Sequence, residues 1–125
     1  EKIIEGHIPK DETISIKKRD FVIRKLANRV AWFQFEQLCG GHIGAEDYIE
    51  MIKYTDQIII ENVPIFNNAN ANMQERFINL IDVLYDNKIQ IIISSVKEIE
   101  KLGSAFYLKD KFQRTVSRLI EMRSN

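Results

Sequence analysis

Two arginines near the end of the chain have the residue type and the spacing to contact a phosphate. Arg114 and Arg118 are four residues apart, so on a helix they project from the same face. A guanidinium offers a planar set of donors that matches phosphate oxygens, and one interpretation is an arginine supplied to a nucleotide. The alternative is a surface ion pair between Arg118 and Glu121, which lies three residues further along that face.

Polar side chains also end two apolar runs. Glu61 and Asn62 follow one run of three isoleucines, and Ser94 and Ser95 follow another. The acid and the amide stand where a Walker B strand carries the aspartate that holds magnesium, and the two serines would be able to sense a bound nucleotide. Polar residues also end strands at the rim of a sheet without any catalytic role, so both interpretations remain open.

A glycine-rich stretch at residues 40–44 (GGHIG) lies between a predicted strand and a predicted helix, where phosphate-binding loops occur. It lacks the Gly-Lys-Ser/Thr ending of a P-loop, so no lysine reaches a phosphate. Glu46 and Asp47 place negative charge in the first turn of the following helix, where it would repel an anion. We therefore expect a plain turn here.

We expect neither a metal site nor a catalytic cysteine. Cys39, His7 and His42 are scattered, whereas a structural zinc site needs four such ligands. Cys39 is more typical of a small buried side chain, and a single cysteine favours a reducing compartment. The formal net charge of zero gives no general attraction for nucleic acid. No apolar run approaches the ~20 residues needed to span a membrane.

The elements that would carry these residues begin with three short apolar segments. Residues 13–17 alternate between apolar and polar side chains, residues 21–24 (FVIR) follow a charged turn, and residues 29–35 (RVAWFQF) follow a second turn. These segments predict a three-stranded antiparallel meander. A short helix from about residue 45 to residue 54 is expected after the glycine-rich turn.

The clearest unit follows that helix. Gln57–Val63 is a short apolar strand, Asn72 caps a helix with Glu75 in the capping-box position, and residues 89–93 form the next strand. Five apolar side chains of the helix fall on one face, namely Met73, Phe77, Leu80, Ile81 and Leu84. This order is a βαβ unit, and its continuous apolar strands require a sheet that is covered on both faces.

The predicted fold class is α/β, with an antiparallel β-meander joined to a βαβ unit and a C-terminal helix. We expect residues 1–12 to form a linker or a frayed N-terminus and residues 13–125 to form a single α/β domain. The C-terminal helix, at residues 111–123, is expected to bury four apolar side chains: Phe112, Val116, Leu119 and Ile120.

Charge is distributed in blocks along the chain. Residues 36–86 hold nine acids against Lys53 and Arg76, whereas seven basic residues lie between Lys97 and Arg123. Six more basic residues crowd an early stretch: Lys17, Lys18, Arg19, Arg24, Lys25 and Arg29. Opposed blocks suit docking between subunits or domains. An alternative function is therefore a protein-protein interaction module with opposed acidic and basic faces.

Four sequence blocks occur in an order that is typical of one family: residues 35–39 (FEQLC), 45–48 (AEDY), 76–86 (RFINLIDVLYD) and 112–122 (FQRTVSRLIEM). They resemble the C-terminal part of the ZapE/AFG-one-like ATPases, which are AAA-related P-loop proteins of bacteria and mitochondria. The resemblance implies that Arg76, Arg114 and Arg118 are candidates for nucleotide contact. The family often has a second arginine just before Arg76, where this chain has Glu75.

The resemblance also implies a function for the complete protein. The family's Walker A, Walker B and first sensor motifs lie upstream of the matching region, so this segment would belong to a P-loop NTPase-like fold without being catalytic alone. ATP and Mg²⁺ would be bound by the complete protein and not by this segment. The implied partners are the remainder of the same ATPase chain, further copies of the protein and an FtsZ-like division partner. We expect a bacterial, cytoplasmic protein linked to cell division, with a mitochondrial location as the alternative.

Overall fold

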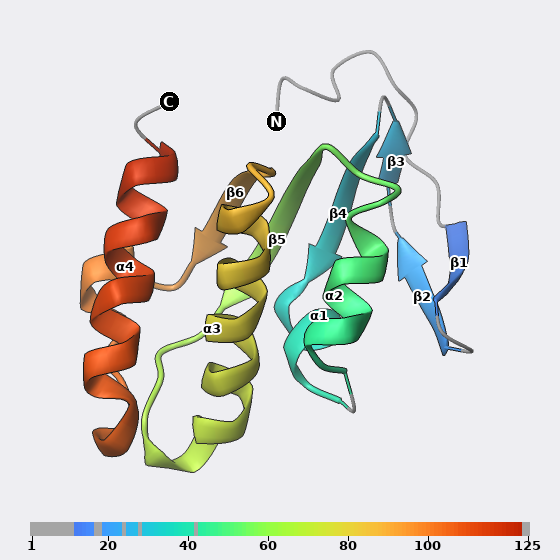
Figure 1. Cartoon of the computed structure of the whole chain (residues 1–125). Helices are drawn as coiled ribbons and strands as arrows, with labels where there is room; N and C mark the ends of the chain where they lie inside the picture. Colours follow the sequence, from blue (N-terminus) through green and yellow to red (C-terminus); the bar gives the residue numbers. More distant parts are fainter. Residues whose placement is uncertain (1–11, 17–18, 24, 28, 42, 124–125) are drawn as a thin grey trace.

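The computed structural model describes residues 12–16, 19–23, 25–27, 29–41 and 43–123. Its centre is a four-stranded sheet in the order β3-β4-β5-β6, with four α-helices on one face (Figure 1). The predicted α/β class is confirmed. The strands of this sheet are β3 (Lys25–Ala27), β4 (Val30–Gln34), β5 (Gln57–Val63) and β6 (Gln90–Ser95).

Strands β4, β5 and β6 run parallel to one another. The chain passes from β4 to β5 through α1 (Phe35–Cys39) and α2 (Ala45–Met51), and from β5 to β6 through α3 (Ala71–Asp86). Parallel strands need connections of this kind, because a tight turn would reverse the strand direction. The predicted βαβ unit is therefore confirmed, and the strand Gln57–Val63 has the predicted bounds.

The predicted three-stranded antiparallel meander is wrong. β1 (Glu12–Ile16) and β2 (Arg19–Ile23) form a separate two-stranded antiparallel sheet. The third predicted strand becomes β4, which pairs antiparallel with β3 but parallel with β5. The physical reason lies in the composition of β4, in which four successive side chains are buried: Val30, Ala31, Trp32 and Phe33. A strand without polar alternation fits an interior position in a sheet, and β4 lies between β3 and β5, rather than in a meander with one solvated face.

Helix α3 begins slightly before its predicted cap. Its N-cap residue is Asn70, which also ends a 3₁₀ helix (η2, Asn68–Asn70), so Asn72 already lies inside α3. The side chain of Asn67 accepts a hydrogen bond from the N–H of Ala69 at 2.8 Å and starts this short helix. Two successive helical starts therefore replace the single capping box that the sequence pattern predicted.

The predicted apolar face of α3 packs into the core. Phe77, Leu80, Ile81 and Leu84 are fully buried, and Met73 is half-buried at the edge of the same cluster. The ring centroid of Phe77 lies 5.8 Å from that of Phe35, 5.6 Å from that of Phe66 and 6.5 Å from that of Phe112. These aromatic contacts join α1, α3 and the C-terminal helix into one core.

The C-terminal helix, α4 (Lys109–Arg123), lies beside α3 on the helical face of the sheet (Figure 1). Phe112 and Leu119 are buried as predicted, whereas Val116 and Ile120 are only half-buried. Two short 3₁₀ helices, η3 (Ile99–Lys101) and η4 (Phe106–Leu108), connect β6 to α4. This packing leaves the polar side of α4 as an outer surface of the molecule.

Candidate functional site

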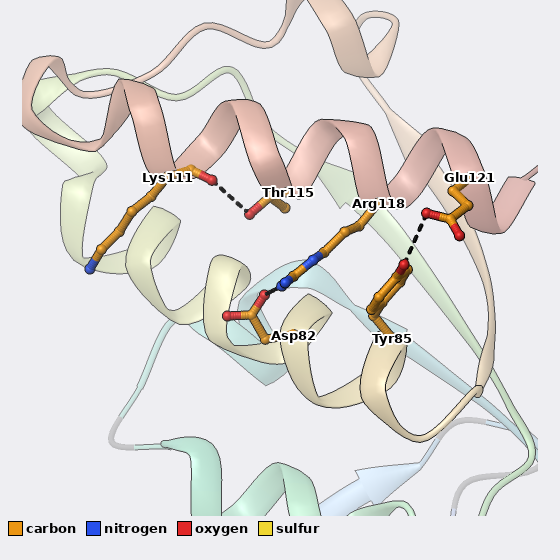
Figure 2. Close-up of polar contacts among 6 residues, drawn as sticks. All are labelled: Asp82, Tyr85, Lys111, Thr115, Arg118 and Glu121. Carbon is orange, nitrogen blue, oxygen red and sulfur yellow. Dashed lines mark hydrogen bonds and ion pairs between the residues drawn. The ribbon is translucent and has the colours of Figure 1, made fainter.

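Arg118 is held by side chains of α3 rather than by its own helix. Its guanidinium forms an ion pair with Asp82 and lies over the ring of Tyr85, 5.0 Å from the centroid. The hydroxyl of Tyr85 donates a hydrogen bond to Glu121 at 2.9 Å, and this bond raises the pKa of Tyr85. Figure 2 shows these four side chains meeting between the two helices. Arg118 thus pairs with Asp82 and not with Glu121, the partner that the sequence spacing suggested.

Arg114 lies one helical turn earlier and is exposed. Among the described residues it has no hydrogen-bond or ion-pair partner, so its guanidinium is available to a ligand. It lines an open groove of about 1290 Å³, together with Asn68, Ser104, Phe106, Lys109 and Gln113. Arg118 lines the same groove, so the two candidate arginines differ in their contacts: α3 engages Arg118, whereas Arg114 has no such partner among the described residues.

Arg76 connects α3 to the end of α1. Its guanidinium donates a hydrogen bond to the carbonyl oxygen of Cys39 at 3.2 Å. Cys39 itself is fully buried, as predicted, and burial raises the pKa of its thiol to about 12. The hydroxyl of Tyr48 donates to the carbonyl oxygen of Leu38 at 2.6 Å. Arg76 therefore satisfies a carbonyl group at the end of α1 within this segment.

The polar side chains that end β5 are brought together by a residue of β4. The amide of Gln34 donates to the carboxylate of Glu61 at 2.6 Å and accepts from the amide of Asn62 at 2.5 Å. Asn62 has a φ of +65°, the left-handed conformation that asparagine tolerates better than most residues. Gln34, Glu61 and Asn62 thus form one cluster at the carboxyl end of the parallel strands, where ligands of α/β sheets usually bind.

The two serines lie at the end of β6, with Ser95 opposite Val63 in the strand register. The hydroxyl of Ser95 donates to the carbonyl oxygen of Lys97 at 2.5 Å, and Ser94 is exposed. The bond of Ser95 closes the turn that follows the strand. Its geometry matches the simple role of a polar residue at the rim of a sheet.

Within the glycine-rich stretch, Gly40 and Gly41 form a bend between α1 and α2. Gly44 precedes α2, and its N–H donates to the carboxylate of Asp47 at 3.0 Å. Asp47 thus satisfies a main-chain N–H at the start of α2, and its negative charge lies in the first turn as expected. His7 and His42 lie outside the described residues. Within the part of the chain that the structure describes, no three His, Cys, Asp or Glu side chains could together hold a metal ion.

The sequence pattern does not identify three residues in or next to the clusters and the groove described above. The sequence pattern predicts Gln34 only as part of a strand, although its side chain joins Glu61 and Asn62. Phe106 and Tyr107 are 78% and 66% exposed. The sequence signal for their exposure is that Phe106 and Tyr107 do not belong to a helical or strand pattern of apolar residues. Without such a pattern, no buried face is predicted for them. Exposed aromatic side chains are typical of binding surfaces.

Helices that could cross a membrane are absent from the described residues, because none combines the required length with the required hydropathy.

Comparisons with known proteins place the chain in a family. The sequence profile of the AFG1-like ATPases matches residues 1–125. Relatives include an uncharacterised protein of Schizosaccharomyces pombe, 31% identical over 91 residues, which are 73% of this chain and 20% of that protein. The cell division protein ZapE of Escherichia coli K12 is 27% identical over 112 residues, which are 90% of this chain and 30% of ZapE.

A third relative is lactation elevated protein 1 homolog B of Danio rerio, 26% identical over 98 residues, which are 78% of this chain and 20% of that protein. No solved structure matches the chain. The chain therefore spans 20 to 30% of the length of these curated relatives. A family profile that matches from the first residue to the last decides the assignment, and this chain belongs to the AFG1-like ATPase family.

Proposed function

We propose that this chain is the C-terminal segment of a P-loop ATPase whose complete polypeptide binds and hydrolyses ATP. The observation that carries the proposal is the match of the ATPase family profile to residues 1–125. The curated relatives are several times longer than the matched part, and this sequence contains no Gly-Lys-Ser/Thr ending of a P-loop. The Walker A and Walker B motifs would accordingly lie in the rest of a P-loop NTPase-like fold.

The described side chains do not fit a magnesium site of their own. Glu61 is engaged by Gln34, and no described group of three acids, histidines or cysteines could hold a metal ion. ATP and Mg²⁺ would accordingly be held by the remainder of the polypeptide. This segment would contribute a cationic side chain to the nucleotide phosphates. Arg114 is the best candidate for that side chain, because it is exposed and faces an open groove.

In this proposal Arg114 contacts a phosphate of the nucleotide that is bound to its own or a neighbouring subunit, while Arg118 holds α4 against α3. A guanidinium that meets the transferring phosphoryl group stabilises the charge that develops on it. Arg118 would first have to leave Asp82 and the ring of Tyr85. Arg76 would likewise have to leave the carbonyl of Cys39. Arg114 needs no such rearrangement.

The test is the ATPase rate of the complete protein carrying Arg114→Ala. We expect a loss on the order of 10³-fold with an unchanged melting temperature, because the side chain is exposed. Gln113→Ala is the matched control, since Gln113 is also exposed and lines the same groove. A normal rate for Arg114→Ala would remove Arg114 from the nucleotide site. If the complete protein shows no ATPase activity at all, the proposed function itself is wrong.

We further propose a link to cell division in the bacterial cytoplasm, with an FtsZ-like protein as the partner and a mitochondrial location as the alternative. The support is the likeness to ZapE, a cell division protein by name. Cosedimentation of the complete protein with polymerised FtsZ provides the test. Binding that is equal to that of an unrelated control protein would contradict the partner.

The alternative function, a protein interaction module, is favoured by one specific observation. Phe106 and Tyr107 are strongly exposed on η4, and Phe106 lines the same groove as Arg114. Replacing both aromatic residues by alanine should leave ATP turnover unchanged if they bind a protein partner. Loss of partner binding with a normal ATPase rate in both this variant and Arg114→Ala would favour the module over the nucleotide role.

A further inference from the structure

The outer edge of β6 is open among the described residues. β6 is the last strand of the sheet and pairs there with β5 alone. The N–H groups of Gln90 and Val96 donate to the carbonyl oxygens of Asp56 and Val63, on the β5 side. Because strand residues alternate in direction, the main-chain groups of Ile91 and Ile93 face the outer edge. These groups form a template for another strand.

The side chains of β6 show that this edge is incompletely covered. Ile58, Ile59 and Ile60 of β5 are buried, whereas the equivalent isoleucines of β6, residues 91–93, are only half-buried. The two triplets are identical in sequence and adjacent in register. The difference follows from position, since β5 has a strand on each side and β6 has one.

A groove of about 920 Å³ runs along this edge and extends to both sides of the strand. On the helical face its wall includes Leu119 and Met122 of α4, together with Ile99. On the opposite face it includes Gln57 and Ile92. The groove thus has an apolar wall on the helical face and a mixed wall on the opposite face, which leaves space on both sides of the edge for the side chains of a further strand, since these point alternately to the two faces.

We propose that the outer edge of β6 pairs with an extended strand from the rest of the complete polypeptide, so that the sheet continues beyond this segment. This inference rests on one part of the proposed function, that the chain is a segment of a longer protein, and not on ATP hydrolysis. The matched part covers only 20 to 30% of the curated relatives, so most of such a chain is available to supply the strand. A tethered strand also has an effective concentration in the millimolar range, which a second copy lacks.

The first test is main-chain amide exchange in the complete protein. We expect the amides of Ile91 and Ile93 to exchange as slowly as that of Gln90, whose N–H is bonded within the sheet. Fast exchange of Ile91 and Ile93 beside a protected Gln90 would overturn the proposal. No substitution is needed, so a folding defect cannot obscure the result.

The second test identifies the occupant. A photoreactive benzoyl-phenylalanine at Ser94, which is exposed on β6, should cross-link within one polypeptide to a segment outside residues 1–125. The same group at Asn79, exposed on α3, is the matched control. A mixture of isotope-labelled and unlabelled protein distinguishes cross-links between copies. Cross-links between copies, or a yield at Ser94 no higher than at Asn79, would overturn the proposal.

The strand pairing at β6 and the proposed ATPase function can be refuted independently of each other. The Ser94 cross-link should form with equal yield in the complete protein carrying Arg114→Ala, because strand pairing does not depend on the nucleotide. An intact cross-link in a protein without ATPase activity would refute the proposed function and leave the strand pairing standing.

Discussion

At the scale of single residues, the two arginines of α4 illustrate how neighbouring side chains of one type acquire different roles. Both lie on one helical face four residues apart, yet α3 presents Asp82 and Tyr85 to Arg118. Arg114, one turn nearer the start of α4, lies beyond that contact. The distinction depends on what α3 places opposite each arginine, which sequence spacing does not contain.

The pairing of Arg118 with Asp82 should contribute modestly to stability. The two side chains are 34% and 42% exposed, so solvent screens their attraction, and we expect a coupling energy of about 0.5–1 kcal/mol. A double-mutant cycle with Arg118→Ala and Asp82→Ala, measured by urea unfolding, gives this energy. The pair of Lys101 and Glu98, 71% and 74% exposed at 3.8 Å, is the control, and we expect no measurable coupling there. Equal coupling in both pairs would contradict the structural role of Arg118.

Cys39 should make stability depend on pH in the alkaline range. Burial raises the pKa of its thiol from 9.0 to about 12, so the folded chain retains a proton that the unfolded chain loses. Stability is therefore fully present below pH 9 and should fall between pH 9 and pH 12, by up to about 1.4 kcal/mol per pH unit. Urea midpoints across this range test the expectation.

Cys39→Ala is the control for that measurement and should show a shallower alkaline decline. Part of the decline should persist, because burial also raises the pKa of Tyr48. Identical pH profiles for Cys39→Ala and the unmodified chain would show that the thiol is not buried as described.

At the scale of elements, α3 unites the core, because its apolar face meets the sheet and the rings of α1 and α4. Phe77 stands at the centre of this contact and is fully buried. Phe77→Ala should therefore cost ~3–5 kcal/mol, through lost burial and the cavity left behind. Urea unfolding measures the change.

Asn79→Ala lies on the same helix with an exposed side chain and should change stability by less than about 0.5 kcal/mol. A similarly small effect of Phe77→Ala would mean that the buried face of α3 is assigned wrongly.

At the scale of the whole molecule, one feature of the sequence bears on ATP turnover. The chain contains no P-loop lysine, and without such a group the nucleotide phosphates are not held in place. We predict that residues 1–125, expressed alone, do not hydrolyse ATP. Steady turnover by the purified segment, abolished by a substitution within it, would contradict this prediction.

The sequence by itself determined the elements with a strong local signal. The uninterrupted apolar run of β5 and the helical period from Phe77 to Leu84 each identify one element without reference to the rest of the chain, and both are confirmed. The resemblance to the ATPase family was also recognised from the sequence alone, and the family is confirmed. Burial of Cys39 followed from its residue type and its isolation.

Only the tertiary structure decided how these elements combine. The partner of each strand depends on the path of the connection between strands, so β4 joined a parallel sheet although its local pattern favoured a meander. The clusters of Gln34 with Glu61, and of Arg118 with Asp82, join residues 27 and 36 positions apart. Their side chains meet because strand register and helix packing bring them together, and local sequence periodicity specifies neither. The distinction between Arg114 and Arg118, on which the proposed role of Arg114 depends, is of this kind.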